Sequence, residues 1–436
     1  MANRHSHQLR NFLAFGSDTV FFSIAFTGFM NPNVILPAFT TRLGGSAESV
    51  GLLIAVISLA WSTPQAIAGN IASRFSRQKP FVLAMALSGR MFIFGLVALI
   101  SLTQANPPWL SLTAIYLALV IFLGTDGFAT IGWMDMLARA FPAKKRGSFI
   151  SIWQAAAAGG VLGVSALVSY LLGEQSAPFP SNYALLFGLA GLFFIGSAIG
   201  TLAIYEPSTA GDMPPPHIAW RDFWSHFVKT LRDDERLRQV TLTRMLFTLG
   251  TIASPFYVLY ATEQLAMDPS LLGTFIGAQT VGIMIAGLTL GRIADRFGAE
   301  RAIQIGICVV LSAPAMALII SFSDGAISLL LPYLYIWIYV CIGLANNLPF
   351  LGFANYILDI APTNQRTVYS GIVNTINSLA MPTLWVAGWL PEHISYEALF
   401  SITLIFCFLA LLFALRLPTS RNLVQAHLSR PAENNA

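Results

Sequence analysis

Long apolar runs separated by short polar stretches dominate the chain, with six runs before position 206 and six after position 238. At a rise of about 1.5 Å per residue, each run can cross a hydrocarbon layer of about 30 Å as a helix. Because lipid offers no hydrogen-bond partner to an open backbone, a helix is the form that such runs take in a membrane. We therefore predict an all-α integral membrane protein with twelve transmembrane helices. The predicted spans are 16–40, 49–73, 81–103, 109–139, 148–172, 183–205, 239–263, 270–291, 302–322, 328–358, 367–390 and 397–417.

The composition agrees with this interpretation. Of 436 residues, 56% are hydrophobic and only 10% are charged, which leaves too few polar residues to cover a water-soluble globule. The net charge is +4, yet the basic residues form no stripe with interleaved aromatics. Nucleic acid is therefore not an expected partner. The expected surroundings are a lipid bilayer.

Lysine and arginine mark one side of the membrane. We assign 22 of the 24 to the tails, the loops after even-numbered spans and the middle segment; the two exceptions are Arg42, in an outer loop, and Arg90, inside a span. The positive-inside rule makes that side cytoplasmic. We expect a multi-pass protein of the inner membrane with a cytoplasmic tail (1–15), a six-helix bundle (16–205), a cytoplasmic linker (206–238), a second bundle (239–417) and a second cytoplasmic tail (418–436).

The linker contains a short amphipathic pattern. Phe223, Phe227 and Leu231 recur every four residues among basic residues. This spacing predicts a helix that lies on the cytoplasmic leaflet.

A motif repeats at half the chain length. Residues 69–79 read GNIASRFSRQK and residues 291–301 read GRIADRFGAER, an offset of 222 residues. Each copy follows an apolar run and ends in basic residues. Two copies of one structural unit are therefore expected, which here means two pseudo-symmetric six-helix bundles.

This motif resembles the loop signature of the major facilitator superfamily, G-x-x-x-D-R-x-G-R-[RK], which joins the second and third helices of each half. The later copy matches at Gly291, Asp295, Arg296, Gly298 and Arg301. The earlier copy keeps Gly69, Arg74, Arg77 and Lys79 but has Ser73 and Ser76 in place of the aspartate and second glycine. The resemblance covers residues 12 to 418 and leaves the substrate open.

The resemblance implies the major facilitator fold and transport by alternating access. It also implies that the motif loops close a cytoplasmic gate. Asp295 would lie near the start of the fifth span, around Gly147 and Ser148, where the helix dipole favours an anion. Ser73 offers no charge, so the Asp295 contact should be the stronger of two unequal latches.

Ionisable residues inside spans are costly, about 2.5–3.5 kcal/mol each at mid-helix, and seldom face lipid. Arg90 and Asp126 are two such residues, in the third and fourth spans. Two roles are open for Asp126. It binds a coupling proton or a cationic group of the substrate, or it forms an intramembrane ion pair with Arg90. Asp135 and Arg139 should pair near the cytoplasmic end, and Asp18 could be a charge at a helix N-terminus.

Polar and aromatic side chains inside the spans could line a substrate path by hydrogen bonding and stacking, or could hold helices together. Together with Asp126, the candidates are Asn31, Asn33, Tyr257, Glu263, Tyr335, Tyr339, Asn346 and Asn347.

The sequence gives little support to other classes of protein. The sequence contains no G-x-x-x-x-G-K-[ST] phosphate loop, no metal-ligand spacing and no G-x-S-x-G elbow, so we expect neither an enzyme nor a bound metal or cofactor. We expect a monomeric secondary or facilitative transporter of a small organic solute, with proton coupling left open. The alternatives are efflux of amphipathic, drug-like compounds by proton antiport and a transporter-like solute sensor.

Overall fold

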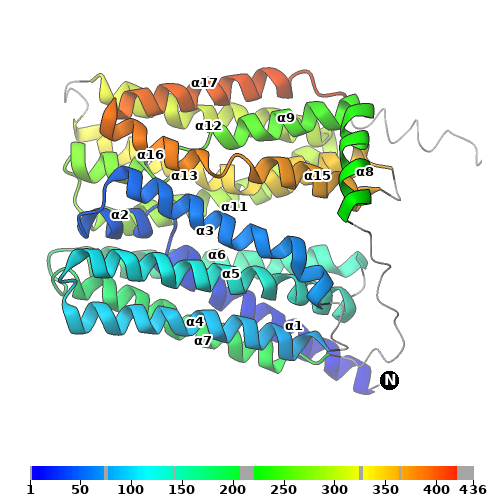
Figure 1. Ribbon diagram of the computed structural model, residues 1–436, viewed down its shortest axis with the longest axis horizontal. Coiled ribbons are helices and arrows are strands. Elements are labelled where there is room, and N and C mark those ends of the chain that lie inside the picture. Colours follow the sequence, from blue (N-terminus) through cyan, green and yellow to red (C-terminus); the bar gives the residue numbers. More distant parts are fainter. Residues whose placement is uncertain are drawn as a thin grey trace, which may run out of the picture. The chain divides into compact units, whose positions relative to one another are not determined.

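The computed structural model describes residues 2–72, 77–141, 143–206, 220–323, 328–362 and 365–419. The secondary-structure elements within these ranges are all helices (Figure 1). Ten of them, with their continuations, are long and apolar enough to cross a membrane. The all-α membrane architecture is therefore confirmed, while the count of twelve spans stays a prediction.

The first half of the chain supplies seven α-helices and one π-helical segment. They are α1 (Ala2–Ser23), η1 (Ile24–Phe29), α2 (Ile35–Arg42), α3 (Ala47–Ala72), α4 (Gln78–Thr103), α5 (Pro108–Ala140), α6 (Ala143–Leu172) and α7 (Ser181–Ala203). The second half contains more and shorter helical segments. They are α8 (Trp220–Asp233), α9 (Glu235–Leu249), α10 (Tyr257–Leu259), η2 (Tyr260–Gln264), α11 (Leu271–Phe297), α12 (Ala299–Ser321), η3 (Ser328–Leu330), α13 (Leu331–Leu348), η4 (Pro349–Ala354), α14 (Asn355–Ile360), α15 (Arg366–Ser378), α16 (Thr383–His393) and α17 (Tyr396–Ala414).

The predicted seventh and eleventh spans are broken helices. The seventh leaves the α-helix at Leu249 and resumes at Tyr257, and Pro255 lies in the gap. The eleventh breaks between α15 and α16, next to Pro382. Proline lacks the N–H of the helical ladder and clashes with the preceding turn, which accounts for both positions. Neither span appears among the ten continuous ones.

The motif at 291–301 lies mostly on a helix. α11 continues to Phe297, six residues beyond the predicted span, and α12 begins at Ala299. Gly298 alone turns the chain, with φ of 101°, a conformation that residues with a Cβ rarely adopt. The loop predicted here is therefore a one-residue break between two helices.

The chain divides into two compact units. Unit 1 contains residues 1–216 together with 255–277 and 384–392, and unit 2 contains 217–254, 278–383 and 393–436. Two segments of the second half therefore pack within unit 1. In one of these contacts the indole nitrogen of Trp385 donates to Glu48 Oε1 at 2.8 Å.

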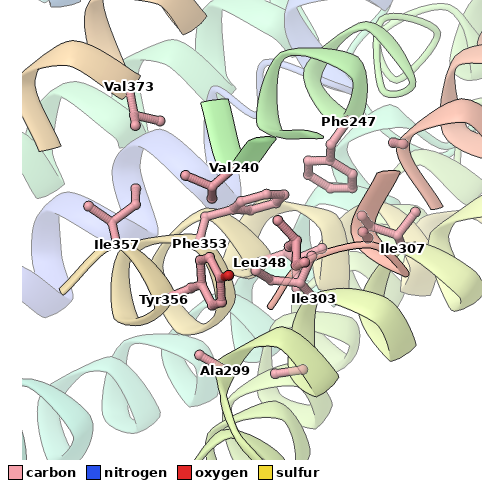
Figure 2. Close-up of a cluster of buried hydrophobic side chains, with 14 of the residues drawn as sticks. Val240, Phe247, Ala299, Ile303, Ile307, Leu348, Phe353, Tyr356, Ile357 and Val373 are labelled. Carbon is pink, nitrogen blue, oxygen red and sulfur yellow. The ribbon is translucent and has the colours of Figure 1, made fainter. Parts of the chain in front are cut away.

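Each unit has its own apolar core. In unit 1, Phe15, Met136, Phe141 and Phe149 are among the buried side chains. In unit 2, Figure 2 shows Phe353 beside Val240 and Phe247. Close helix crossings support these cores, since a Cβ on Gly343 of α13 would lie 1.9 Å from the carbonyl oxygen of Gln279 on α11. Glycine there lets the two backbones touch.

Helix α8 lies across the ends of α9 and α15 within unit 2 (Figure 1). Phe227 is 7% exposed and belongs to the core of this unit, and Leu231 packs against the same core. The side chain of Phe223 lies outside the described residues. The described apolar face of the amphipathic helix is thus covered by protein, and not by the lipid headgroups that the pattern had suggested.

Candidate functional site

The most unusual side chains in the spans are buried charges, beginning with Arg90 on α4. Arg90 is 5% exposed. Its Nη1 donates to the carbonyl oxygen of Phe194 at 3.0 Å, and its guanidinium carbon lies 5.6 Å and 5.9 Å from the ring centroids of Phe194 and Phe22. Asp18 and Asp126 are both within its electrostatic reach, with Asp18 the stronger partner. Two carboxylates and two aromatic rings therefore compensate this cation.

Asp18 is the centre of a hydrogen-bonded cluster. It lies in the interior of α1 and is 7% exposed. Its Oδ2 accepts a hydrogen bond from Trp133 Nε1 at 2.7 Å, and its Oδ1 accepts one from the hydroxyl of Ser197. The suggestion that Asp18 stands at a helix N-terminus is wrong, because α1 begins at Ala2. The polar pair Ser197 and Thr201, one turn apart in an apolar span, was the sequence signal for this cluster.

Asp126 on α5 is half-buried. It lies within hydrogen-bonding reach of Trp61 and within electrostatic reach of Arg90. No direct N–O contact within 4.0 Å joins Arg90 to Asp18 or to Asp126 in the described part of the chain. The predicted pair of Asp135 and Arg139 is confirmed, with Nη2 of Arg139 2.6 Å from Oδ2 of Asp135.

Arg244 on α9 is a second intramembrane arginine, and the sequence analysis missed it. It was counted with the cytoplasmic charges although it falls five residues inside the predicted span 239–263. Its Nε is buried and has no hydrogen-bond partner among the described residues. Its guanidinium carbon lies 5.9 Å from the ring centroid of Phe353. Comparing every lysine and arginine with the span boundaries would have found it.

The predicted asparagines have different environments. Asn31 is fully buried; its Nδ2 donates to Thr27 O at 2.8 Å and its Oδ1 accepts from the backbone N–H of Asn33 at 2.9 Å. These bonds hold the helix break at Pro32. Asn347 ties α13 to α11, because its Nδ2 donates to Ile283 O at 2.9 Å. Asn346 is exposed.

The predicted tyrosines are enclosed in packing. Tyr335 and Tyr339 of α13 are fully buried in unit 2, and Tyr257 of α10 is 2% exposed in unit 1. Glu263 is exposed on η2. Nearby, the backbone N–H of Ser270 donates to Oδ1 of Asp268 at 2.7 Å, and the hydrogen bonds from Ser270 lower the pKa of Asp268.

The motif residues are only partly described. Ser73 and Arg74 lie outside the described residues, as do the side-chain surroundings of Gly69, Gly147 and Ser148. In the later copy, Gly291, Asp295 and Arg296 lie on the last turns of α11, with Asp295 and Arg296 exposed. Arg301 Nη1 donates to Gln304 Oε1 at 2.9 Å. The cytoplasmic latch therefore stays a prediction.

Apolar helices of spanning length that enclose charged and hydrogen-bonded side chains define this chain as a multi-pass membrane protein of the transporter class. The model of the Major Facilitator Superfamily matches residues 19–383 and 242–433, and the chain belongs to that family. No curated protein matches the sequence.

Solved structures share the fold at low sequence identity. A bacterial homologue of the iron transporter ferroportin, in an inward-facing state, has a TM-score of 0.66 at 12% identity over 95% of this chain and 98% of that one. A nucleoside transporter has a TM-score of 0.65 at 14% identity, over 94% and 98%. The xylose transporter XylE from E. coli, in an inward-open conformation, has a TM-score of 0.64 at 16% identity, over 97% and 99%.

Proposed function

We propose that this protein is a secondary transporter of the inner membrane that moves a small organic solute by alternating access. The family supports a transporter, and not an enzyme. The sugar and nucleoside transporters among the structural neighbours make hydrophilic organic solutes the first class to test. The distribution of basic residues supports cytoplasmic tails and a cytoplasmic linker, and we propose a monomer as the transporting unit.

The observation that carries the coupling proposal is the unequal environment of two carboxylates near Arg90. Both oxygens of Asp18 accept hydrogen bonds, and the side chain is buried. Asp126 is half-buried and lacks such a pair of hydrogen bonds, and neither carboxylate forms a direct ion pair with Arg90 among the described residues. Asp18 is therefore the fixed counter-charge of Arg90, while Asp126 has the access that a proton carrier needs. We propose Asp126 as the coupling site.

Flux through proteoliposomes tests this function. Radiolabelled xylose, uridine and lactate would be offered with and without a pH gradient. In the Asp126→Asn variant, we expect gradient-driven flux to be lost while counterflow exchange continues, because exchange needs no net proton transfer. Asp135→Asn is the matched control, since Asp135 is an aspartate of the same helix in a half-exposed pair. Equal loss of driven flux and exchange in Asp126→Asn would contradict the coupling role.

A further inference from the structure

The two buried arginines differ in what surrounds them, and Arg244 is the one that lacks a counter-charge. Within the described residues neither arginine forms an ion pair or a hydrogen bond through Nε, but Arg90 has two carboxylates within electrostatic reach and Arg244 has none. The acidic residues from position 220 to position 419 lie at the ends of the predicted spans or outside them, at Asp222, Asp233, Asp234, Glu235, Glu263, Asp268, Asp295, Glu300, Asp324, Asp359, Glu392 and Glu397. The predicted spans of unit 2 thus offer no mid-membrane carboxylate to this guanidinium.

Arg244 lies inside a predicted span, which makes this absence costly. It follows the first residue of the span 239–263 by five residues, about 8 Å along the helix axis. A charge in a span is usually paired or faces a pathway. The ring of Phe353 compensates only part of the cost, because a cation–π contact is weaker than an ion pair.

Two further hydrogen-bonding side chains lie one helical turn after Arg244, one on α9 and one on α15. Thr248 lies one turn after Arg244 on α9, and its hydroxyl donates to Oδ1 of Asn377 on α15 at 2.6 Å. That bond fixes the amide so that the Nδ2 group of Asn377 remains a donor. Arg244 and Asn377 are both half-buried, on helices α9 and α15 that contact each other. A guanidinium and an amide NH₂ are both donors to an anion.

Aromatic side chains form the apolar side of the same region. Phe353 is fully buried beside Phe247, with ring centroids 5.8 Å apart, and Figure 2 shows both next to Val240. Val240 and Phe247 lie on α9 about one turn before and after Arg244. The guanidinium therefore lies beside a packed aromatic pair, with its carbon 5.9 Å from the ring centroid of Phe353.

We infer that Arg244 binds the carboxylate of the transported solute, which is an organic monocarboxylate. One uncompensated positive charge matches one negative charge, whereas a phosphate dianion would call for a second cation that the described residues of unit 2 do not place here. A guanidinium pairs with a carboxylate through two parallel hydrogen bonds. This inference rests on the proposed transport function and names the substrate class.

Thermal-shift measurements on the purified full chain test the inference without requiring flux. The probes are lactate, benzoate and nicotinate, each against its neutral amide, with inorganic phosphate as a further probe. We expect at least one acid to raise Tm by several degrees while its amide does not. The shift should vanish in Arg244→Gln and persist, weakened, in Arg244→Lys. No shift with any acid, an equal shift with the amide, or a larger shift with phosphate would each overturn the inference.

A second variant separates ligand binding from a structural role. Thr248→Glu places a carboxylate one turn from Arg244, where it can pair with the guanidinium. We expect the Tm without ligand to rise and the acid-induced shift to disappear. An unchanged acid-induced shift would show that Arg244 does not bind the acid.

The flux assay keeps the two proposals apart. Driven flux of xylose or uridine that persists in Arg244→Gln, together with no acid-induced shift, would leave the transport function standing and overturn the inference. An acid-induced shift that depends on Arg244, with no flux of lactate, xylose or uridine, would support the binding site and contradict transport.

Discussion

Arg90 in unit 1 and Arg244 in unit 2 are the same residue type, yet their surroundings differ. Arg90 has Asp18 and Asp126 within electrostatic reach and a hydrogen bond to Phe194. Arg244 has the ring of Phe353. The 222-residue offset of the repeat relates Arg90 to Ser312, so the second half has no counterpart of the first arginine.

The comparison separates two roles that a buried charge can have, one structural and one functional. A charge with its counter-charge stabilises the fold, because removal of one partner leaves the other buried and uncompensated. A charge without a partner costs stability, and inside a span it marks a candidate ligand path. Arg90 fits the first description and Arg244 the second.

The largest effect should come from removing Arg90, the arginine with two carboxylates within electrostatic reach. Arg90→Met leaves Asp18 and Asp126 without their cation, and we expect a loss of about 3–5 kcal/mol in unfolding free energy. Chemical unfolding in detergent would measure it. Arg139→Met is the control at a half-exposed arginine. A loss below about 1 kcal/mol would mean that Arg90 is not a structural cation.

The second prediction tests which of the two carboxylates interacts more strongly with Arg90. In the Arg90→Met background, Asp18→Asn should restore about 2 kcal/mol, within the range seen for coupled residues. Asp126→Asn should restore less, since Asp18 is the stronger partner. Double-mutant cycles give both coupling energies. A larger rescue by Asp126→Asn would make Asp126 the ion-pair partner and remove the basis of the coupling proposal.

A smaller effect of opposite sign is expected at the unpaired arginine. Arg244→Met loses a cation–π contact worth about 0.5–1 kcal/mol but removes an uncompensated charge from a span. We expect unfolding without ligand to become harder by about 1 kcal/mol. Destabilisation by more than about 2 kcal/mol would show that Arg244 has a partner within the protein. It would contradict the proposed difference between Arg244 and Arg90.

The smallest effect should be at the half-exposed pair on α5. Asp135→Asn removes an i,i+4 contact in which both side chains are partly accessible, and we expect a loss of about 0.3–0.5 kcal/mol. The same unfolding assay at low and high salt would detect it, because an accessible pair is screened by salt. A loss comparable to that of Arg90→Met would show that accessibility does not separate these arginines.

The sequence by itself determined the class of the protein. Continuous apolar runs predict spanning helices, because helix is the form that satisfies the backbone in lipid, and the repeated motif predicts two related halves. Local chemistry was also readable, since the four-residue spacing of Asp135 and Arg139 predicts their ion pair. These features depend on neighbours along the chain.

The tertiary structure alone decided which buried charges are satisfied. Asp18 and Ser197 are 179 residues apart, and Arg90 and Phe194 are 104 residues apart, so no pattern along the chain joins them. Arg244 lies beside Phe353 for the same reason. Helix packing brings side chains from distant spans together, and it also leaves some positions without a partner. The hydrophobic pattern places a residue inside a span, but it does not determine which side chains contact that residue in the folded protein.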